Sequence, residues 1–248
     1  MNTPADWIIP EWPAPHCVKT LITTRLGGFS QGRYTSFNLG DHVGDDALAV
    51  RENRELLCKY LPAEPKWLKQ VHGTKVANAD TLYAPVEADA SVARKANNLC
   101  AILSADCLPL LMCDANESVV AAVHCGWRGL AAGVIEKTVS AMRTDPGALL
   151  AYLGPGISRK AYEVGEDVRE AFMRSDASAQ QAFSAREPGK WLADLYLLAR
   201  ERLNCLGVKK IYGGNFCTYI EAGRFFSHRR DGNTGRMASL IWLDAKRE

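Results

Sequence analysis

Two histidines and one cysteine of this sequence carry side chains that could do chemistry together. His72 and His124 each follow a short apolar run and precede a glycine-containing turn, and Cys107 lies between them in the chain. Imidazole and thiolate are ligands that zinc prefers. Three protein ligands would leave one coordination position open, as catalytic zinc sites do. The set His72, Cys107 and His124 is therefore a candidate metal site.

Spacing alone does not decide for a metal. The three residues are separated by 35 and 17 positions, and ordinary core or turn residues are the better interpretation of such spacing. Copper is an alternative, because two His, one Cys and a weak Met ligand such as Met112 suit a blue-copper centre. Five histidines without an H-x-H pair, however, cannot supply a multicopper cluster as well. A third alternative is a nucleophilic Cys107 or Cys125 activated by a histidine.

The elements that must position these side chains follow from hydrophobic periodicity. Apolar runs predict a strand-dense middle, with both histidines at strand ends where side chains of different strands converge. Expected strands cover residues 18–24, 67–71, 99–103, 108–113, 119–124, 149–153, 209–212 and 237–243; expected helices run from Asp45 or Asp46 to before Pro62, over 130–142, over 166–173, and from about Trp191 to Gly207. This order, without repeats or linkers, predicts one mixed α/β domain over residues 1–248.

Composition restricts the class of protein. Among 248 residues, 30 Lys and Arg oppose 28 Asp and Glu, which gives a net charge of +2 and excludes a polyelectrolyte that binds nucleic acid. No run approaches the roughly 18 apolar residues of a membrane span, and no N-terminal apolar segment suggests export. Eight cysteines without a C-x-x-C pair favour reduced thiols. We expect a cytoplasmic protein, and the oligomeric state stays open.

Several motifs distributed along the whole chain carry a family resemblance. They are TTR with GGFS (residues 23–30), SFNLG (36–40), QVHG (70–73), ADCLPL (105–110), HCGWRG (124–129), LGPGI (153–157), YEVG (162–165), CT (217–218), and FFSHRR with TGRM (225–237). In this order they resemble the YfiH family. That family was first described as multicopper polyphenol oxidase or laccase-like, and later as purine nucleoside phosphorylase.

The resemblance implies a function and a fold. It implies zinc on His72, Cys107 and His124, phosphorolysis of adenosine, inosine and methylthioadenosine, and an adenosine deaminase activity. The fold would resemble that of toxin-type cysteine hydrolases, a layered α/β sandwich. Many relatives carry Ala at the position of Cys125, which leaves Cys107 as the functional thiol. Three alternatives stay open: a copper-dependent polyphenol oxidase, a Cys107 hydrolase that edits peptidoglycan precursors, and a non-enzymatic metal-responsive interaction protein.

Phosphorolysis needs cations for phosphate and a group that stabilises the developing positive charge on ribose. The candidate phosphate ligands are Arg25, Arg128, and Arg229 together with Arg230, and Arg128 is favoured because it begins a predicted helix. Asn38 and Ser227 are candidate substrate contacts, although turn-stabilising hydrogen bonds are the commoner role of such residues.

Deamination would instead use water at C6 of adenine and a carboxylate that carries the proton. Asp106, Asp89 and Glu163 are candidates for that carboxylate. The position of Asp106 beside Cys107 favours it, with a turn-orienting role as the alternative.

Overall fold

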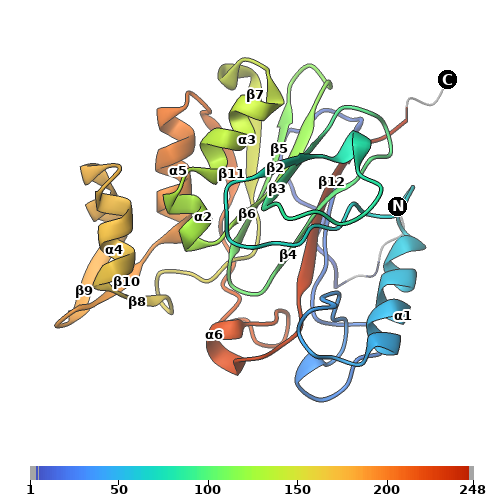
Figure 1. Cartoon of the computed structure of the whole chain (residues 1–248), viewed down its shortest axis with the longest axis horizontal. Helices are drawn as coiled ribbons and strands as arrows, with labels where there is room; N and C mark the ends of the chain where they lie inside the picture. Colours follow the sequence, from blue (N-terminus) through green and yellow to red (C-terminus); the bar gives the residue numbers. More distant parts are fainter. Residues whose placement is uncertain (1–3, 5, 246–248) are drawn as a thin grey trace.

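Two β-sheets packed face to face form the centre of the protein (Figure 1). The structure is a computed structural model, and it describes residue 4 and residues 6–245. The larger sheet has the strand order β11-β7-β5-β6-β3-β2 and mixes parallel and antiparallel pairs. Its strands are β2 (Val76–Asn78), β3 (Ala90–Ala93), β5 (Leu108–Asp114), β6 (Val120–Cys125), β7 (Leu149–Leu153) and β11 (Lys210–Gly213).

The smaller sheet is antiparallel, in the order β1-β12-β4. It contains β1 (Val18–Ile22), β4 (Cys100–Ser104) and β12 (Met237–Leu243). Side chains alternate along its strands, so that Ile22 and Ile241 pack with Leu111 of β5 between the two sheets. The opposite face of the smaller sheet, with Leu240 and Trp242, packs with residues of α1.

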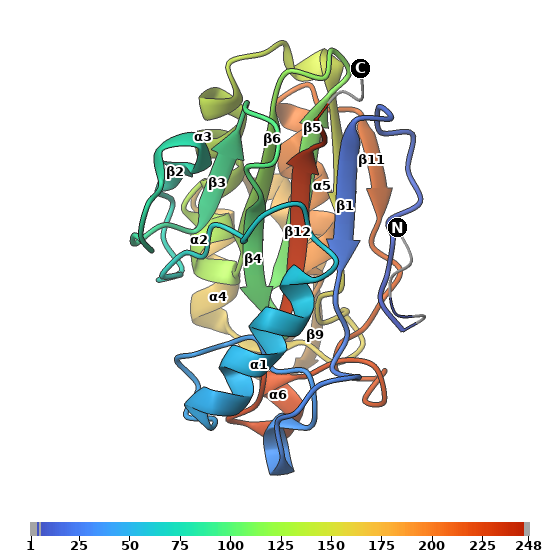
Figure 2. The same cartoon turned by 90° about the vertical axis from the view of Figure 1, so that its right-hand side faces the viewer.

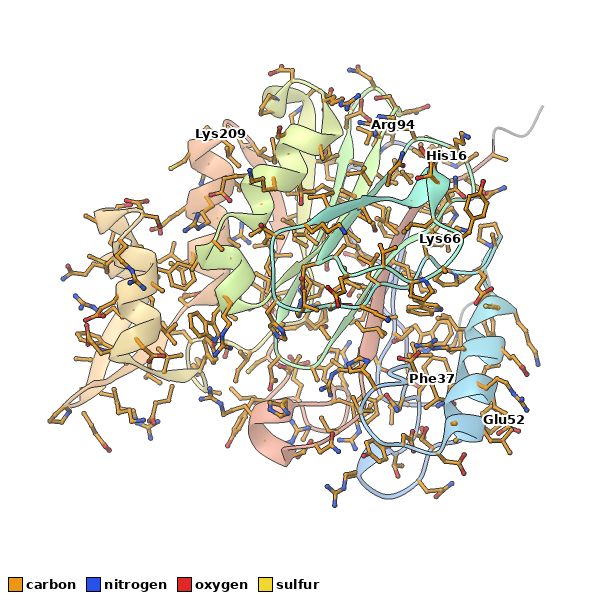
Figure 3. All side chains as sticks on the ribbon, in the orientation of Figure 1. His16, Phe37, Glu52, Lys66, Arg94 and Lys209 are labelled. Atoms are coloured by element: carbon orange, nitrogen blue, oxygen red, sulfur yellow. The ribbon has the colours of Figure 1, made fainter. Side chains whose placement is uncertain are left out.

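Helices cover both outer faces, which produces four layers (Figure 2). The larger sheet is covered by α3 (Val134–Met142) and α5 (Leu195–Cys205), with α2 (Trp127–Ala131) and α4 (Glu166–Met173) beside them. The smaller sheet is covered by α1 (Ala47–Cys58), where Figure 3 shows Phe37 on the sheet side and Glu52 on the outer side. The predicted layered α/β sandwich is confirmed. No helix in the described part of the chain has the length and apolar character to cross a membrane.

A third, small sheet lies beside α4 and changes one prediction. Its order is β8-β10-β9, from β8 (Glu163–Gly165), β9 (Phe183–Glu187) and β10 (Lys190–Ala193). Trp191, expected at the start of a helix, therefore lies in a strand. Its apolar neighbours fit either periodicity, and the helix α5 begins only after Asp194, whose side chain accepts a hydrogen bond from Leu197 N at 3.0 Å.

Two further expectations are wrong. Residues 67–71 form no strand: Lys69 makes only an isolated backbone bridge to Glu87, and the side chain of Gln70 binds the backbone N and O of Leu103, each at 2.8 Å. The helix expected over residues 130–142 is divided into α2 and α3, because Gly133 adopts a left-handed conformation with φ 94°. The predicted limits of β7, α4 and β12 agree with the structure, and Asp46 caps α1 as expected.

Candidate functional site

The chain brings His72, Cys107 and His124 together at one end of the larger sheet. Antiparallel pairing sets His124 of β6 opposite Pro109 of β5, so that Cys107, just before β5, lies beside the end of β6. The ligand atoms of the three residues all lie within 4.8 Å of one another. Cys107 Sγ is 3.8 Å from His72 Nε2, and the two imidazole centroids are 4.8 Å apart. His72 is exposed, Cys107 half-buried and His124 buried.

This geometry fits a metal ion. Tetrahedral zinc, with bonds of about 2.0 to 2.3 Å, separates its N and S ligands by roughly 3.3 to 3.6 Å, so small side-chain rotations would close the cluster. Gly126 leaves the necessary space. A Cβ at this position would lie 2.7 Å from His72 Cδ2 and 3.2 Å from Cys107 Sγ. Among residues 4 and 6–245, this is the one group of three or more His, Cys, Asp or Glu side chains able to hold a metal.

A single buried carboxylate organises two of the three side chains. Asp89 Oδ1 accepts hydrogen bonds from His124 Nδ1 at 2.8 Å and from the backbone N of His72 at 2.9 Å. Its Oδ2 accepts from Gly73 N at 2.7 Å and Val71 N at 3.2 Å. Burial opposes the charge of Asp89, but these hydrogen bonds and His124 hold its pKa below the ordinary value. The bond to Nδ1 leaves His124 Nε2 for the metal.

Cys107 and His124 stabilise each other's charged forms. Burial alone would raise the pKa of Cys107, but the charge of His124 and hydrogen bonds from His124 and His72 outweigh it and lower the pKa to about 6. Burial would likewise lower the pKa of His124, but the Cys107 charge and Asp89 raise it to about 9. Both shifts favour a thiolate beside an imidazolium near neutral pH in metal-free protein, and coordination through a protonated His124 would release a proton.

Asp106, the predicted proton carrier, uses both carboxylate oxygens within the protein. Oδ1 accepts a hydrogen bond from Thr218 Oγ1 and Oδ2 accepts from Arg229 N, each at 2.6 Å. The backbone oxygen of Asp106 accepts from Ile157 N at 2.9 Å. Its backbone has φ 89°, a conformation that costs free energy for a residue with a side chain. Asp106 thus connects the loop carrying Cys107 to three distant segments.

The candidate arginines differ in the hydrogen-bond and ring partners of their guanidinium groups. Arg25 donates to the backbone oxygens of Thr35 and Ala222, and its guanidinium lies 4.8 Å from the ring centroid of Phe226. Arg229 donates to the backbone oxygen of Glu163, and its guanidinium lies over the ring of Tyr162. Arg128 is exposed and stacks on the neighbouring Trp127, 4.4 Å from its ring centroid.

Asn38 and Ser227 are buried and bonded within the protein. Asn38 Oδ1 accepts from Gly40 N at 2.9 Å and from Arg236 N at 2.8 Å, and its Nδ2 donates to Asp45 Oδ2 at 2.9 Å. Ser227 accepts from Arg230 N and caps the short helix α6 (His228–Asp231).

Sequence reasoning missed two residues beside the cluster. Burial raises the pKa of Tyr162, and the charge of Cys107 raises it further. The guanidinium of Arg236 interacts electrostatically with Cys107 and Asp106. Both residues belong to motifs that carried the family resemblance, which was the available signal. A cavity of about 740 Å³ lies elsewhere, between α1 and residues 61–64, and includes none of these residues.

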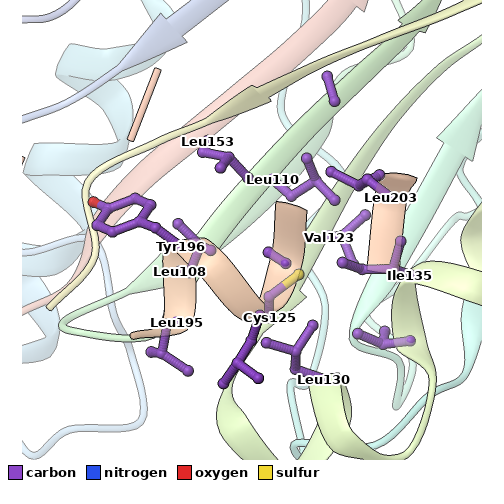
Figure 4. Close-up of a cluster of buried hydrophobic side chains, with 14 of the residues drawn as sticks. Leu108, Leu110, Val123, Cys125, Leu130, Ile135, Leu153, Leu195, Tyr196 and Leu203 are labelled. Carbon is purple, nitrogen blue, oxygen red and sulfur yellow. The ribbon is translucent and has the colours of Figure 1, made fainter. Parts of the chain in front are cut away.

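Cys125 is excluded as a fourth ligand by the direction of its side chain. It lies one residue beyond His124 in β6 and therefore points to the opposite face of the sheet. Figure 4 shows its sulfur among Leu108, Leu130 and Ile135 in the core under the helices. Burial raises the pKa of this thiol well above its usual value. Cys107 is therefore the thiol of the site.

Comparison with known proteins identifies the family. Residues 19–244 match the model of a family described as multi-copper polyphenol oxidoreductase laccase. The chain belongs to this family. A member from Escherichia coli, named purine nucleoside phosphorylase YfiH, is 51% identical over 239 residues, covering 95% of this chain and 98% of that protein. A purine nucleoside phosphorylase of Pseudomonas aeruginosa is 49% identical over 238 residues, covering 96% and 98%.

Solved structures of the family share the fold. The Neisseria meningitidis protein NMB0706 superposes with a TM-score of 0.94 at 53% identity, covering 97% of this chain and all of that one. YlmD of Geobacillus stearothermophilus gives a TM-score of 0.87 at 29% identity, with 96% of each chain covered. The resemblance to YfiH proteins found in the sequence is therefore confirmed.

Proposed function

We propose that this protein is a zinc-dependent purine nucleoside phosphorylase that acts on adenosine, inosine and methylthioadenosine, with adenosine deamination as a second reaction. The observation that carries the proposal is the cluster of His72, Cys107 and His124, with Asp89 behind it, in a chain about half identical to proteins named purine nucleoside phosphorylase. The nucleoside and phosphate would meet at the exposed side of the cluster, beside His72.

Zinc is favoured over copper by the surroundings of the cluster. Met112, the candidate weak ligand of a blue-copper centre, is buried in the core between β5 and the helices. It lies three residues along β5 from Pro109, the partner of His124, which corresponds to about 10 Å. A site of two imidazoles and one thiolate with a hydrogen-bonded carboxylate behind it suits zinc with an open position.

Phosphorolysis defines what the residues of the chain must do. A phosphate oxygen forms a bond to ribose C1′ while the C1′–N9 bond breaks, and the departing purine takes up a proton. Bound zinc would supply Lewis-acid polarisation at its open coordination position. Asp89 fixes the tautomer and the direction of His124, and it holds the backbone of His72. Asp106 acts as a positioning residue, because both of its oxygens already accept hydrogen bonds.

The arginines and polar residues around the cluster take different parts in this proposal. Arg128 and Arg229 are exposed cations that attract phosphate toward the cluster. Arg25, Asn38 and Ser227 hold the surrounding loops through bonds to the backbone. The reactive end of the site thus depends on buried polar contacts, while its rim carries the exposed positive charge.

The experiment that tests the proposal uses purified protein of measured metal content with adenosine, in the presence and absence of phosphate. Phosphorolysis yields adenine and ribose 1-phosphate only with phosphate, whereas deamination yields inosine and ammonia without it. Chelation should stop both reactions, and zinc should restore them. Cys107→Ala should be inactive at equal protein concentration.

Each alternative predicts a different result in the same experiment. Oxygen consumption with a phenol and copper would indicate the oxidase described by the family name. Hydrolysis of peptidoglycan precursors that survives chelation would indicate thiol chemistry at Cys107. Stoichiometric zinc without any turnover would indicate an interaction protein. Any of these results, without phosphorolysis, would refute the proposed function.

A further inference from the structure

Arg236 stands beside the reactive loop because of strand register. The antiparallel pair of β12 and β4 sets Met237 opposite Ser104. The preceding residue, Arg236, therefore lies at the level of Ala105, next to Asp106 and Cys107 in the chain. The charges of Cys107 and Asp106 act on its guanidinium. Arg236 thus approaches the cluster from the smaller sheet, whereas His124 and Cys107 approach from the larger one.

The backbone of Arg236 is held on both sides by the SFNLG segment. Its N donates to Asn38 Oδ1 at 2.8 Å, and its oxygen accepts from Leu39 N at 3.1 Å. The stem of the side chain packs against Gly40, where a Cβ would lie only 2.8 Å from Arg236 Cγ. Asn53 Nδ2 donates to the backbone oxygen of Asn38 at 2.8 Å. These contacts fix the backbone position of Arg236 and the path of its aliphatic side-chain carbons.

The guanidinium of Arg236 is only partly satisfied. Nη1 donates to the backbone oxygens of Thr234 at 2.7 Å and Gly235 at 3.0 Å. In the part of the chain that the structure describes, Nε and Nη2 meet no hydrogen-bond acceptor, and no carboxylate lies within ion-pair distance of this arginine. Burial lowers its pKa. Arg236 is half-buried, and a partly desolvated cation without a partner anion is less stable than a paired one, so the arrangement favours binding of an anion.

The other arginines around the cluster differ from Arg236 in exposure or in partners. Arg25 is also half-buried and has no carboxylate partner among the described residues, but both its Nε and its Nη1 donate to backbone oxygens and its guanidinium lies over an aromatic ring. Arg230 pairs with Asp231 at 2.7 Å. Arg128 and Arg229 are exposed, so water and salt weaken their electrostatic interactions with anions. The nearby carboxylate of Asp106 is directed to Thr218 Oγ1 and Arg229 N, so its oxygens are engaged away from Arg236.

We propose that Arg236 is the anion-binding residue of the site, and that its Nε and Nη2 bind two oxygens of inorganic phosphate beside Cys107. The planar fork of an arginine suits two oxygens of one phosphate. Asn38 is then a positioning residue, which acts by fixing the backbone of Arg236. This inference rests on the proposed phosphorolysis for the identity of the anion.

The test compares Arg236→Gln and Arg236→Lys with Arg51→Gln. Arg51 lies exposed on α1, and its partner is Glu55 at 3.6 Å, also exposed. Calorimetry with inorganic phosphate on zinc-loaded protein gives Kd directly, and steady-state kinetics give KM for phosphate and for adenosine separately. Loss of two charge-assisted hydrogen bonds should weaken phosphate binding about 10- to 100-fold in Arg236→Gln. Arg236→Lys should be intermediate, and Arg51→Gln unchanged.

A comparison of KM for phosphate with KM for adenosine distinguishes a loss of phosphate binding from a general structural defect. We expect KM for phosphate to rise with Kd in Arg236→Gln, while KM for adenosine stays within about twofold. Unchanged phosphate affinity in folded, zinc-loaded Arg236→Gln would refute the inference, and so would an equal rise of both KM values. If the Gln variant does not fold, wild-type phosphate affinity in Arg236→Lys refutes it. Phosphate binding that depends on Arg236 in a protein without nucleoside turnover would support the subsite and reject phosphorolysis.

Discussion

Asp89 and His124 are 35 residues apart in the chain, yet their side chains meet at 2.8 Å in a buried hydrogen bond. The same carboxylate binds the backbone N of His72, Gly73 and Val71. One acidic residue therefore sets the direction of one imidazole and the path of the loop that carries the other. The geometry of the candidate metal centre depends on a residue that is not itself a ligand.

Asp89→Asn should lower zinc affinity by about 10- to 100-fold, the usual cost of losing such a carboxylate behind a ligand histidine. The amide retains the size of the side chain but places an N–H group against backbone donors. Competition with a fluorescent chelator measures the affinity. Asp114→Asn is the matched control, because Asp114 is equally buried and accepts three hydrogen bonds from Ser118 and Val119 at the far end of β5. Equal zinc affinity in both variants would contradict the assigned role.

Gly126→Ala should remove zinc binding while the fold persists. The added methyl group would lie 2.7 Å from His72 Cδ2, too close for the imidazole to keep its place. The backbone itself would tolerate alanine, because Gly126 has φ −65°. Circular dichroism and metal analysis of the same preparation check both statements. Gly223→Ala, where a Cβ would meet nothing within 4 Å, is the control; full zinc content in Gly126→Ala would argue against the metal centre.

Cys107→Ala and Cys125→Ala should differ sharply in zinc content and turnover. We expect about one zinc per chain in the wild type and none in Cys107→Ala, with loss of turnover. Cys125→Ala should keep its zinc and lose about 1 kcal/mol of the free energy of unfolding, since it leaves a small cavity in the core. Mass spectrometry of metals and thermal unfolding measure these quantities. Zinc retained in Cys107→Ala would overturn the ligand assignment.

The pH dependence of thiol alkylation tests the charged pair in metal-free protein. Because the pKa of Cys107 is lowered to about 6, its thiolate forms as pH rises through that value and disappears as pH falls below it. Iodoacetamide should thus react with an inflection near pH 6, well below the ~8.5 of an ordinary thiol. Peptide mapping identifies the labelled cysteine, and added zinc should protect it. An inflection above pH 8 would show that the imidazoles do not stabilise the thiolate.

The sequence predicted the strands and helices of the layered fold better than it predicted which side chains meet at the site. Runs such as residues 149–153 and 237–243 are almost entirely apolar, and they are strands with the predicted limits. Short amphipathic segments were ambiguous: Trp191 fits a helical stripe, but partners on both sides place it in a strand. Local periodicity cannot show which distant segments will pair with one another.

The candidate ligands were found from residue type and from their expected position at strand ends, although no strand directly precedes His72 in the described chain, and the family resemblance chose among the alternatives. Their contact depends on the pairing of β5 with β6 and on the bonds of Asp89, neither of which local sequence contains. Arg236 was missed because the absence of a partner anion cannot be read from the sequence. A half-buried arginine without a carboxylate partner is recognised only once its neighbours in space are known.

Arg128→Ala should have a small effect that depends on salt, because this arginine is exposed at the rim of the site. Exposed charges contribute about 0.2 to 1 kcal/mol, which corresponds to a rise of roughly 1.5- to 5-fold in KM for phosphate. The rise should disappear near 0.5 M salt, where screening reaches only a few ångströms. Deamination, which uses water, should be unaffected at either salt concentration. A large loss that persists in high salt would instead make Arg128 a direct phosphate ligand, and an equal loss of both reactions would indicate that Arg128 stabilises the turn after His124.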